Sequence, residues 1–333
     1  MNEKTILEIK NLFVEYHTDE AVVYAVNGVD LNVKENTTVG LVGETGAGKT
    51  TTAMSILRLI SNQFGVVKAD KIELAGQDVM TLSDWEMNKI RGKEAAMIFQ
   101  DPMTALDPVY HVGDQIAEAI LLHNDNITKT EAARLAGDML EVVGIPRIRA
   151  SEYPHQFSGG MKQRVVIAIA LACNPKLLIA DEPTTALDVT IQAQILETMQ
   201  DLKEKYHMAM IMITHDLGIV AEVCDEVAVM YAGRIIEQGT LEDIFRHTRH
   251  PYTEGLFNSL PDINDRKRSL TPIPGLMPNP SIHVSGCPFA PRCRYATEEC
   301  KKRKPEKKYF SESHFVECLR YEEKDFHIER KDK

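Results

Sequence analysis

Apolar and polar residues alternate in short runs between residues 5 and 35, as in residues 7–12 and 29–33. This alternation predicts antiparallel strands with one solvated face. Mostly apolar runs, which are typical of buried strands, follow at Thr38–Val42, Ala95–Phe99, Leu177–Ala180 and Ala209–Ile213. The chain therefore predicts an α/β core with an antiparallel part near its N-terminus.

Helical spacing dominates between Val112 and about Cys173, where apolar residues recur three or four positions apart. Thr128 precedes Glu131 by three positions, as in a capping box. Strand-forming runs lie on both sides of this segment, so we expect a helical subdomain inserted into the α/β core. A strand and turn are also expected over residues 71–76.

A phosphate-binding motif follows the first apolar run. The pattern G-x-x-x-x-G-K-[ST] is matched by Gly43, Glu44, Thr45, Gly46, Ala47, Gly48, Lys49 and Thr50. Its glycines let backbone N–H groups turn toward a polyphosphate without interference from Cβ atoms. Lys49 is expected at the β- and γ-phosphates and Thr50 on Mg²⁺. A helix predicted over Thr51–Ile60 presents its positive end to the same phosphates.

Three further strands end in residues suited to nucleotide chemistry. Asp181 and Glu182 follow one apolar run, and His215 and Gln100 follow two others. We expect Asp181 in the Mg²⁺ shell and Glu182 as the group that polarises a water for attack on the γ-phosphate. His215 is a candidate γ-phosphate sensor, and Gln100 is placed to contact Mg²⁺ or the attacking water.

Ser158, Gly159 and Gly160 open a second helix-start motif, before the apolar helix of residues 165–173. A Ser-Gly-Gly helix start offers a hydroxyl and backbone amides to an anion. The first loop already binds one end of the nucleotide, so this motif predicts a second phosphate contact.

An aromatic residue on the N-terminal strands is a candidate to stack on the purine base. Tyr16 precedes the phosphate loop with enough strand between them to fold back over it. A lone aromatic in this position is more often a half-buried strand residue, and Tyr24 is the competing candidate.

Charge and hydropathy narrow the class of protein. A net charge of −11 and a pI near 5.5 argue against a protein that coats nucleic acid. The longest apolar run, residues 165–173, has nine residues, well short of the roughly 20 that cross a bilayer. The N-terminus is polar and lacks the apolar stretch of a signal peptide. We therefore expect a protein without membrane spans that works in the cytoplasm.

In their order along the chain, these motifs resemble the ATPase subunit of ATP-binding-cassette (ABC) transporters over residues 5–245. The resemblance implies a head-to-tail dimer that encloses two ATP molecules, with Ser158 and Gly160 acting in trans and Asp188 at the dimer interface. It makes Glu182 the general base and gives Gln100 the coupling to membrane subunits. Met161 departs from the commoner Gln of the family, and residues 157–164 resemble the variant of peptide importers.

The tail resembles the C-terminal extension of dipeptide and oligopeptide importer ATPases, in residues 250–253, Leu260-Pro261 and residues 273–275. Four of the six cysteines lie in this tail, with gaps of five, six and seventeen residues, at Cys287, Cys293, Cys300 and Cys318. This spacing favours zinc poorly. Four thiolates suit a [4Fe–4S] cluster, which some peptide importers that resemble this chain carry. Zinc and metal-free thiols, reduced or as disulfides, are the alternatives.

We expect a P-loop ATPase core of ABC type with an antiparallel β subdomain (residues 1–99 and 174–250), a helical signature subdomain (100–173) and a small metal-binding extension (251–333). The resemblance implies an ATP-hydrolysing importer subunit for dipeptides or oligopeptides, peripheral on the cytoplasmic face of the cell membrane. Its expected partners are a second, related ATPase, two membrane permease subunits and an extracytoplasmic peptide-binding protein, with no nucleic acid. The alternatives are an importer of nickel or another small solute, an ABC ATPase outside transport, and a regulatory module whose cysteines sense redox state.

Overall fold

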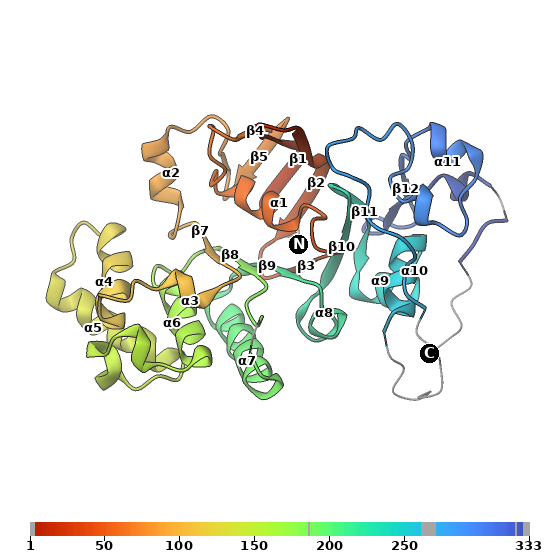
Figure 1. The fold of residues 1–333 in the computed structure, drawn as a ribbon. Helices are drawn as coiled ribbons and strands as arrows, with labels where there is room; N and C mark the ends of the chain where they lie inside the picture. The colour runs from red at the N-terminus through yellow and green to blue at the C-terminus, as the bar shows by residue number, and fades with distance from the viewer. Residues whose placement is uncertain (1–3, 186, 261–270, 324, 329–333) are drawn as a thin grey trace.

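The alternating N-terminal residues form an antiparallel sheet in the computed structural model, which describes residues 4–185, 187–260, 271–323 and 325–328 (Figure 1). Its strands run in the order β2-β1-β5-β6, and β4 also pairs with β1. They are β1 Thr5–His17, β2 Val22–Lys34, β4 Gly65–Lys68, β5 Lys71–Leu74 and β6 Gln77–Asp78. Leu7 and Ile9 are fully buried, while Glu8 between them pairs with Lys71. The predicted alternation is confirmed.

The apolar runs form a second, larger sheet in the order β12-β13-β11-β10-β3-β9-β8-β7. The strands are β3 Thr38–Val42, β7 Ala95–Ile98, β8 Leu177–Asp181, β9 Ala209–Thr214, β10 Glu226–Tyr231, β11 Arg234–Thr240, β12 Lys307–Tyr309 and β13 Phe315–Glu317. From β10 through β3, β9 and β8 to β7 every pairing is parallel. The carboxyl ends of these strands therefore meet at one edge, where open α/β sheets bind ligands. Phe99, predicted as strand, lies beyond β7 and is 45% exposed.

Residues of the central strands alternate between the two faces of this sheet. Met210 and Met212 of β9 pack with the helices, whereas Ile211 and Ile213 pack with the antiparallel sheet and α1. Both sets are buried because each face is covered. This explains why the strand sequence is a continuous apolar run and not an alternating one.

The helix after the phosphate loop, α1 Lys49–Ile56, begins earlier and ends earlier than the predicted 51–60. It stops because Arg58 adopts a left-handed backbone, with φ of 49°. The Arg58 guanidinium then reaches back to backbone carbonyls of Val79 and Leu82. A further short helix, α2 Asp84–Ile90, carries the capping box of Ser83 and Glu86.

The helical insertion projects from the end of the core that lies opposite the C-terminal extension (Figure 1). Its elements are α3 Pro102–Ala105, α4 Val112–Leu122, α5 Lys129–Val142, the 3₁₀ turns Arg147–Ser151 and Pro154–Gln156, and α6 Gly159–Leu171. Thr128 caps α5 by accepting the Glu131 N–H. The core continues through α7 Val189–Tyr206 and α8 Leu217–Val223.

The C-terminal extension is joined to the core by strand pairing. It follows α9 Leu241–Arg246 of the core and contains α10 Pro251–Asn258, the 3₁₀ turns Ala290–Arg292 and Leu319–Glu322, and α11 Glu298–Lys302. Its β12–β13 hairpin extends the large sheet because β13 pairs with β11. Pro261, part of the predicted tail motif, lies outside the described residues. Among the described helices, none is both long enough and apolar enough to cross a membrane.

Candidate nucleotide site

The phosphate loop connects β3 to α1, and its glycines are required by close backbone contacts. A Cβ on Gly43 would lie 2.1 Å from the Met230 carbonyl oxygen. A Cβ on Gly48, whose φ is +103°, would lie 2.5 Å from the Ala25 carbonyl oxygen. The loop therefore packs directly on backbone, with Ala47 buried beneath it and Thr45 and Gly46 exposed at its tip.

The side chain of Lys49 extends across the phosphate loop to the residues at its start. Its Nζ donates to the carbonyl oxygens of Gly43 at 2.7 Å and Glu44 at 3.0 Å. The side chain is 7% exposed. Burial lowers the pKa of Lys49, although the carboxylates of Asp181, Glu182 and Glu44 oppose this shift. The ammonium group thus lies at the mouth of the loop, facing the acidic end of β8.

Asp181, the last residue of β8, lies close to the Thr50 side chain, whose hydroxyl favours the ionised carboxylate. Asp181 is 3% exposed. Burial raises the pKa of its carboxyl, and the negative charge of Glu182 adds to the shift while Thr50 opposes it. The pair brings a hydroxyl oxygen and a carboxylate together at the start of α1.

Glu182 lies one residue beyond β8, and three side chains hold its carboxylate in place. Gln100 Nε2 and Thr185 Oγ1 donate to Oε2, each at 2.9 Å, and His215 Nδ1 lies 3.0 Å from Oε1. Burial opposes ionisation, but the hydrogen bonds from His215 and Thr185 outweigh it and hold the pKa of Glu182 below its usual range. The strand ends of β7, β8 and β9 therefore converge on one carboxylate.

Thr185 was not predicted as part of this site. It stands three residues after Glu182, in the loop that leads to α7, and its hydroxyl reaches back to the carboxylate. A threonine three positions after an acidic residue at a strand end was the available signal. Glu182 itself has a left-handed backbone, with φ of 47°, which turns the chain sharply at this point.

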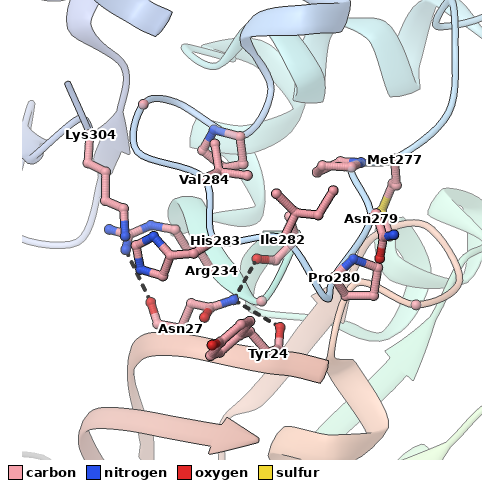
Figure 2. A pocket seen from close by; sticks show the side chains of 16 residues that line it. Tyr24, Asn27, Arg234, Met277, Asn279, Pro280, Ile282, His283, Val284 and Lys304 are labelled. Carbon is pink, nitrogen blue, oxygen red and sulfur yellow. Dashed lines mark hydrogen bonds between the residues drawn. The ribbon is translucent and has the colours of Figure 1, made fainter. Parts of the chain in front are cut away.

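The structure distinguishes the two candidate aromatic residues. The Tyr16 hydroxyl donates to Thr51 Oγ1 at 3.4 Å, so Tyr16 lies beside the first turn of α1. Tyr24 lies under the segment of residues 277–284 (Figure 2), and its ring meets the His283 ring edge-on at 6.0 Å. Of the two residues, Tyr16 is the one in contact with the phosphate-loop helix.

The second anion motif lies away from the phosphate loop of its own chain. Ser158 caps the N-terminus of α6 and accepts the Met161 N–H, while Asp188 caps α7 and accepts the Ile191 N–H at 2.9 Å. Ser158, Gly159 and Asp188 are exposed, and Gly160 is partly buried beside Ile191. No hydrogen bond among the described residues joins these groups to the phosphate loop.

The four cysteines of the tail line a single small cavity. Cys287, Cys293, Cys300 and Cys318 all face it, together with His250. All four are free thiols. Burial raises the pKa of Cys287 and of Cys293 to about 11 and that of Cys318 to about 12. Within the described ranges, no three His, Cys, Asp or Glu side chains have an arrangement that could hold a metal ion.

Comparisons with known proteins agree with this geometry. A family model described as ABC transporter matches residues 26–185, and one for the C-terminal region of oligopeptide/dipeptide transporters matches residues 236–300. The oligopeptide transport ATP-binding protein AppD of Bacillus subtilis is 46% identical over 321 residues, which cover 96% of this chain and 98% of AppD. OppD of the same organism is 49% identical over 314 residues, which cover 93% and 87%.

The fold also matches a solved dimeric ATP-binding cassette in a post-hydrolysis state, bound to ADP and Pi. The TM-score is 0.63 at 27% identity, over 71% of this chain and 98% of that one. Both the cassette and its C-terminal extension therefore have counterparts in known proteins. The chain belongs to the family of ABC transporter ATPase subunits of oligopeptide and dipeptide importers.

Proposed function

We propose that this chain hydrolyses ATP to power uptake of dipeptides or oligopeptides through two membrane permease subunits, supplied by an extracytoplasmic peptide-binding protein. The observation that carries the ATPase assignment is the Glu182 carboxylate, held by three side chains beside the phosphate loop. The choice of peptide is supported by the names of the relatives and by the match of the C-terminal extension.

The phosphate loop binds ATP through its own backbone and Lys49. The Lys49 ammonium exchanges its contacts with the Gly43 and Glu44 carbonyls for the β- and γ-phosphate oxygens. This exchange replaces two neutral acceptors with charged ones, which strengthens the hydrogen bonds. Tyr16, beside Thr51, stacks on the purine base.

The residues present fit a bound Mg²⁺. Thr50 and Asp181 supply a hydroxyl and a carboxylate oxygen, the donor types that Mg²⁺ prefers. Gln100, whose Nε2 donates to Glu182, offers its amide oxygen as a further donor. When bound, Mg²⁺ neutralises charge on the phosphate oxygens. A buried carboxylate with a raised pKa also gains most from a cation partner.

Glu182 is the general base in this mechanism. An ionised carboxylate offers about four acceptor positions, and the structure uses three of them for Gln100, Thr185 and His215. The remaining position accepts a proton from the attacking water. Because the hydrogen bonds hold its pKa below the usual range, the carboxylate is ionised at neutral pH. His215 contacts the γ-phosphate and, through its Nδ1, also contacts Glu182.

A second cassette completes the site. Ser158 and Gly160 at the N-terminus of α6 contact the γ-phosphate bound by the partner, and Asp188 acts across the same interface. The exposed start of α6, away from the phosphate loop of its own chain, is open to such a partner. We propose a related but different chain as that partner, as implied by the resemblance to importers with two ATPases.

The permease subunits dock on the helical insertion. A groove there is lined by the exposed Tyr110 and Leu122 and by acidic residues that include Asp114 and Glu118. An amphipathic permease helix with basic residues complements this apolar floor and acidic rim. In the sequence, the groove begins at Ala105, five residues after Gln100. Gln100 in turn donates to Glu182, so it connects the docking surface to the proposed base. In this proposal the chain works on the cytoplasmic face of the membrane, bound to the permease subunits.

The four-cysteine cavity fits a [4Fe–4S] cluster better than zinc. One zinc ion bound at about 2.3 Å by four sulfurs needs all four within a tight tetrahedron, and the described residues contain no such group. In a four-iron cluster each thiolate binds a different iron, so the four sulfurs do not have to converge on one point. All four cysteines line the same small cavity.

Uptake in reconstituted vesicles tests the proposed function. Vesicles that contain the chain, its permease subunits and the binding protein should accumulate labelled dipeptides or oligopeptides only with ATP, and Lys49→Met should abolish uptake. Lys205→Met, at an exposed position in the last turn of α7, serves as the control substitution. Accumulation of nickel without peptide would assign the other solute, and full uptake by the Lys49 variant would refute the ATPase role.

A further inference from the structure

The C-terminal extension makes a direct ion pair with the phosphate loop. Arg292 Nη1 lies 2.8 Å from Glu44 Oε2, and Nη2 lies 3.0 Å from Oε1, so the contact is bidentate. The Arg292 side chain is 6% exposed, and that of Glu44 is 31% exposed. Arg292 is held in turn by the Pro274 carbonyl at 2.9 Å and the Tyr231 hydroxyl at 3.3 Å. Such a partly buried, bidentate contact is geometrically specific.

A second contact reaches the backbone of the same residue. The Glu44 N–H donates to the Tyr252 hydroxyl at 2.9 Å. The Tyr252 ring packs on Tyr231 and Phe289, with centroids 4.7 and 5.5 Å away. All three rings are buried. Both the side chain and the amide of Glu44 are therefore oriented by residues outside the phosphate loop.

These contacts begin in the segment that carries the cysteines. Phe289 and Arg292 lie between Cys287 and Cys293, and Arg292 directly precedes Cys293. Phe289 also lines the cysteine cavity. A shift in this turn moves the guanidinium that contacts the phosphate loop and the Phe289 ring that packs on Tyr252.

The segment after Pro274 adds a third contact. A Cβ built on Gly46 would lie 3.4 Å from Met277 Cε, so this methionine lies beside the tip of the loop. Figure 2 shows Met277 and Pro280 in the segment of residues 277–284, which crosses above Tyr24. This segment and the turn of residues 287–293 therefore flank the outer side of the phosphate loop.

We infer that Arg292 is a positioning residue for the phosphate loop, and that it couples the four-cysteine segment to nucleotide binding. The positive charge of Arg292 neutralises the Glu44 carboxylate. Without Arg292, this negative charge in the phosphate loop would repel the bound polyphosphate. The fork of Arg292 fixes the position of the loop while Lys49 exchanges carbonyls for phosphates. The inference rests on the ATPase assignment alone and not on what the cysteines bind.

Nucleotide binding to the full-length chain tests this inference. Arg292→Gln leaves the Glu44 charge uncompensated, so the Kd for MgATP and the KM for hydrolysis should rise about tenfold, while kcat stays within about twofold. Arg292→Lys keeps the positive charge but cannot make the bidentate contact. Its Kd for MgATP should lie between those of the native chain and Arg292→Gln. Glu44→Gln in the Arg292→Gln chain should restore most of the affinity, because the repelling charge is gone. Arg303→Gln, which breaks an exposed bidentate pair with Glu322 in the same extension, is the matched control.

Thermal unfolding separates folding from positioning. The Kd values of the Arg292 and Arg303 variants are compared only if each variant still unfolds cooperatively on heating. An unchanged Kd in Arg292→Gln, or a double variant that binds no better than Arg292→Gln, would overturn the inference. A general loss of structure moves kcat and Kd together and gives no rescue by Glu44→Gln.

The coupling to the cysteines has its own test. Cys293→Ser should raise the Kd for MgATP in the native background and leave it unchanged in the Arg292→Gln background. Equal effects in both backgrounds would show that the cysteine segment does not act through Arg292. Iron and sulfide content is measured separately, so a chain that holds no cluster still tests the coupling.

Discussion

His215 Nδ1 lies 3.0 Å from Glu182 Oε1, and this contact joins the ends of two neighbouring parallel strands. Asp181 of β8 pairs with Ile213 of β9, so the register places the residues that follow each strand side by side. The Glu182 N–H also donates to the Ile213 carbonyl at 2.9 Å. The proposed base and the proposed phosphate sensor are therefore positioned by sheet register.

Glu182→Gln should lower kcat by a factor of about 10²–10⁴, because an amide cannot accept the proton of the attacking water. The variant keeps its size and its contact with Thr185, so ATP should still bind and the closed dimer should accumulate. Single-turnover hydrolysis and size-exclusion chromatography with ATP measure the two effects. Glu197→Gln, at an exposed position on α7, is the control. Native turnover in the Glu182 variant would refute its assignment as the base.

Thr185→Val should move the acid limb of the pH–rate profile to higher pH. The Thr185 hydroxyl helps to hold the pKa of Glu182 below its usual value, and the base works only when ionised. Removing the hydrogen bond raises that pKa, so activity is lost earlier as the pH falls. Profiles of kcat/KM between pH 4.5 and 8 report the ionisation in the free enzyme. Thr130→Val on the exposed face of α5 should leave the profile unmoved, and a Thr185 profile identical to native would contradict the role.

Tyr16→Ala should weaken ATP binding about tenfold, which is the scale of one stacked base. Inorganic triphosphate has no base, so its affinity should not change in this variant. Tyr24→Ala is the matched control, because Tyr24 lies under residues 277–284 and not beside α1 (Figure 2). Loss of ATP affinity in the Tyr24 variant alone would reverse the assignment.

The strands and the phosphate loop could be predicted because local patterns determine them. Apolar runs such as Ala209–Ile213 mark buried parallel strands, and the glycines of the loop are required by backbone contacts such as that of Gly43 with Met230. The end of α1 was misjudged because the left-handed turn at Arg58 depends on carbonyls of a distant segment. Local patterns carry no information on such partners.

Long-range contacts explain the other omissions. Arg292 contacts Glu44 across 248 positions, and nothing in the local sequence around either residue indicates the other. The β12–β13 hairpin has only three residues in each strand, too few for a periodic signal of its pairing with β11. The assembly of Gln100, Glu182 and His215 was anticipated because all three follow strands of one parallel sheet.

Metal analysis of anaerobically purified protein tests the tail. About four irons and four acid-labile sulfides per chain are expected, since each thiolate of a [4Fe–4S] cluster binds one iron. Cys287→Ser removes one ligand from the cavity and should lose the cluster and its visible absorption. Cys173→Ser, a half-buried thiol whose Sγ lies 3.4 Å from the Ala119 carbonyl, should retain both. One zinc per chain without iron would make the tail a structural zinc site. A metal-free chain with ordinary ATP affinity would leave the aromatic rings and Arg292 as the connection between the tail and the phosphate loop.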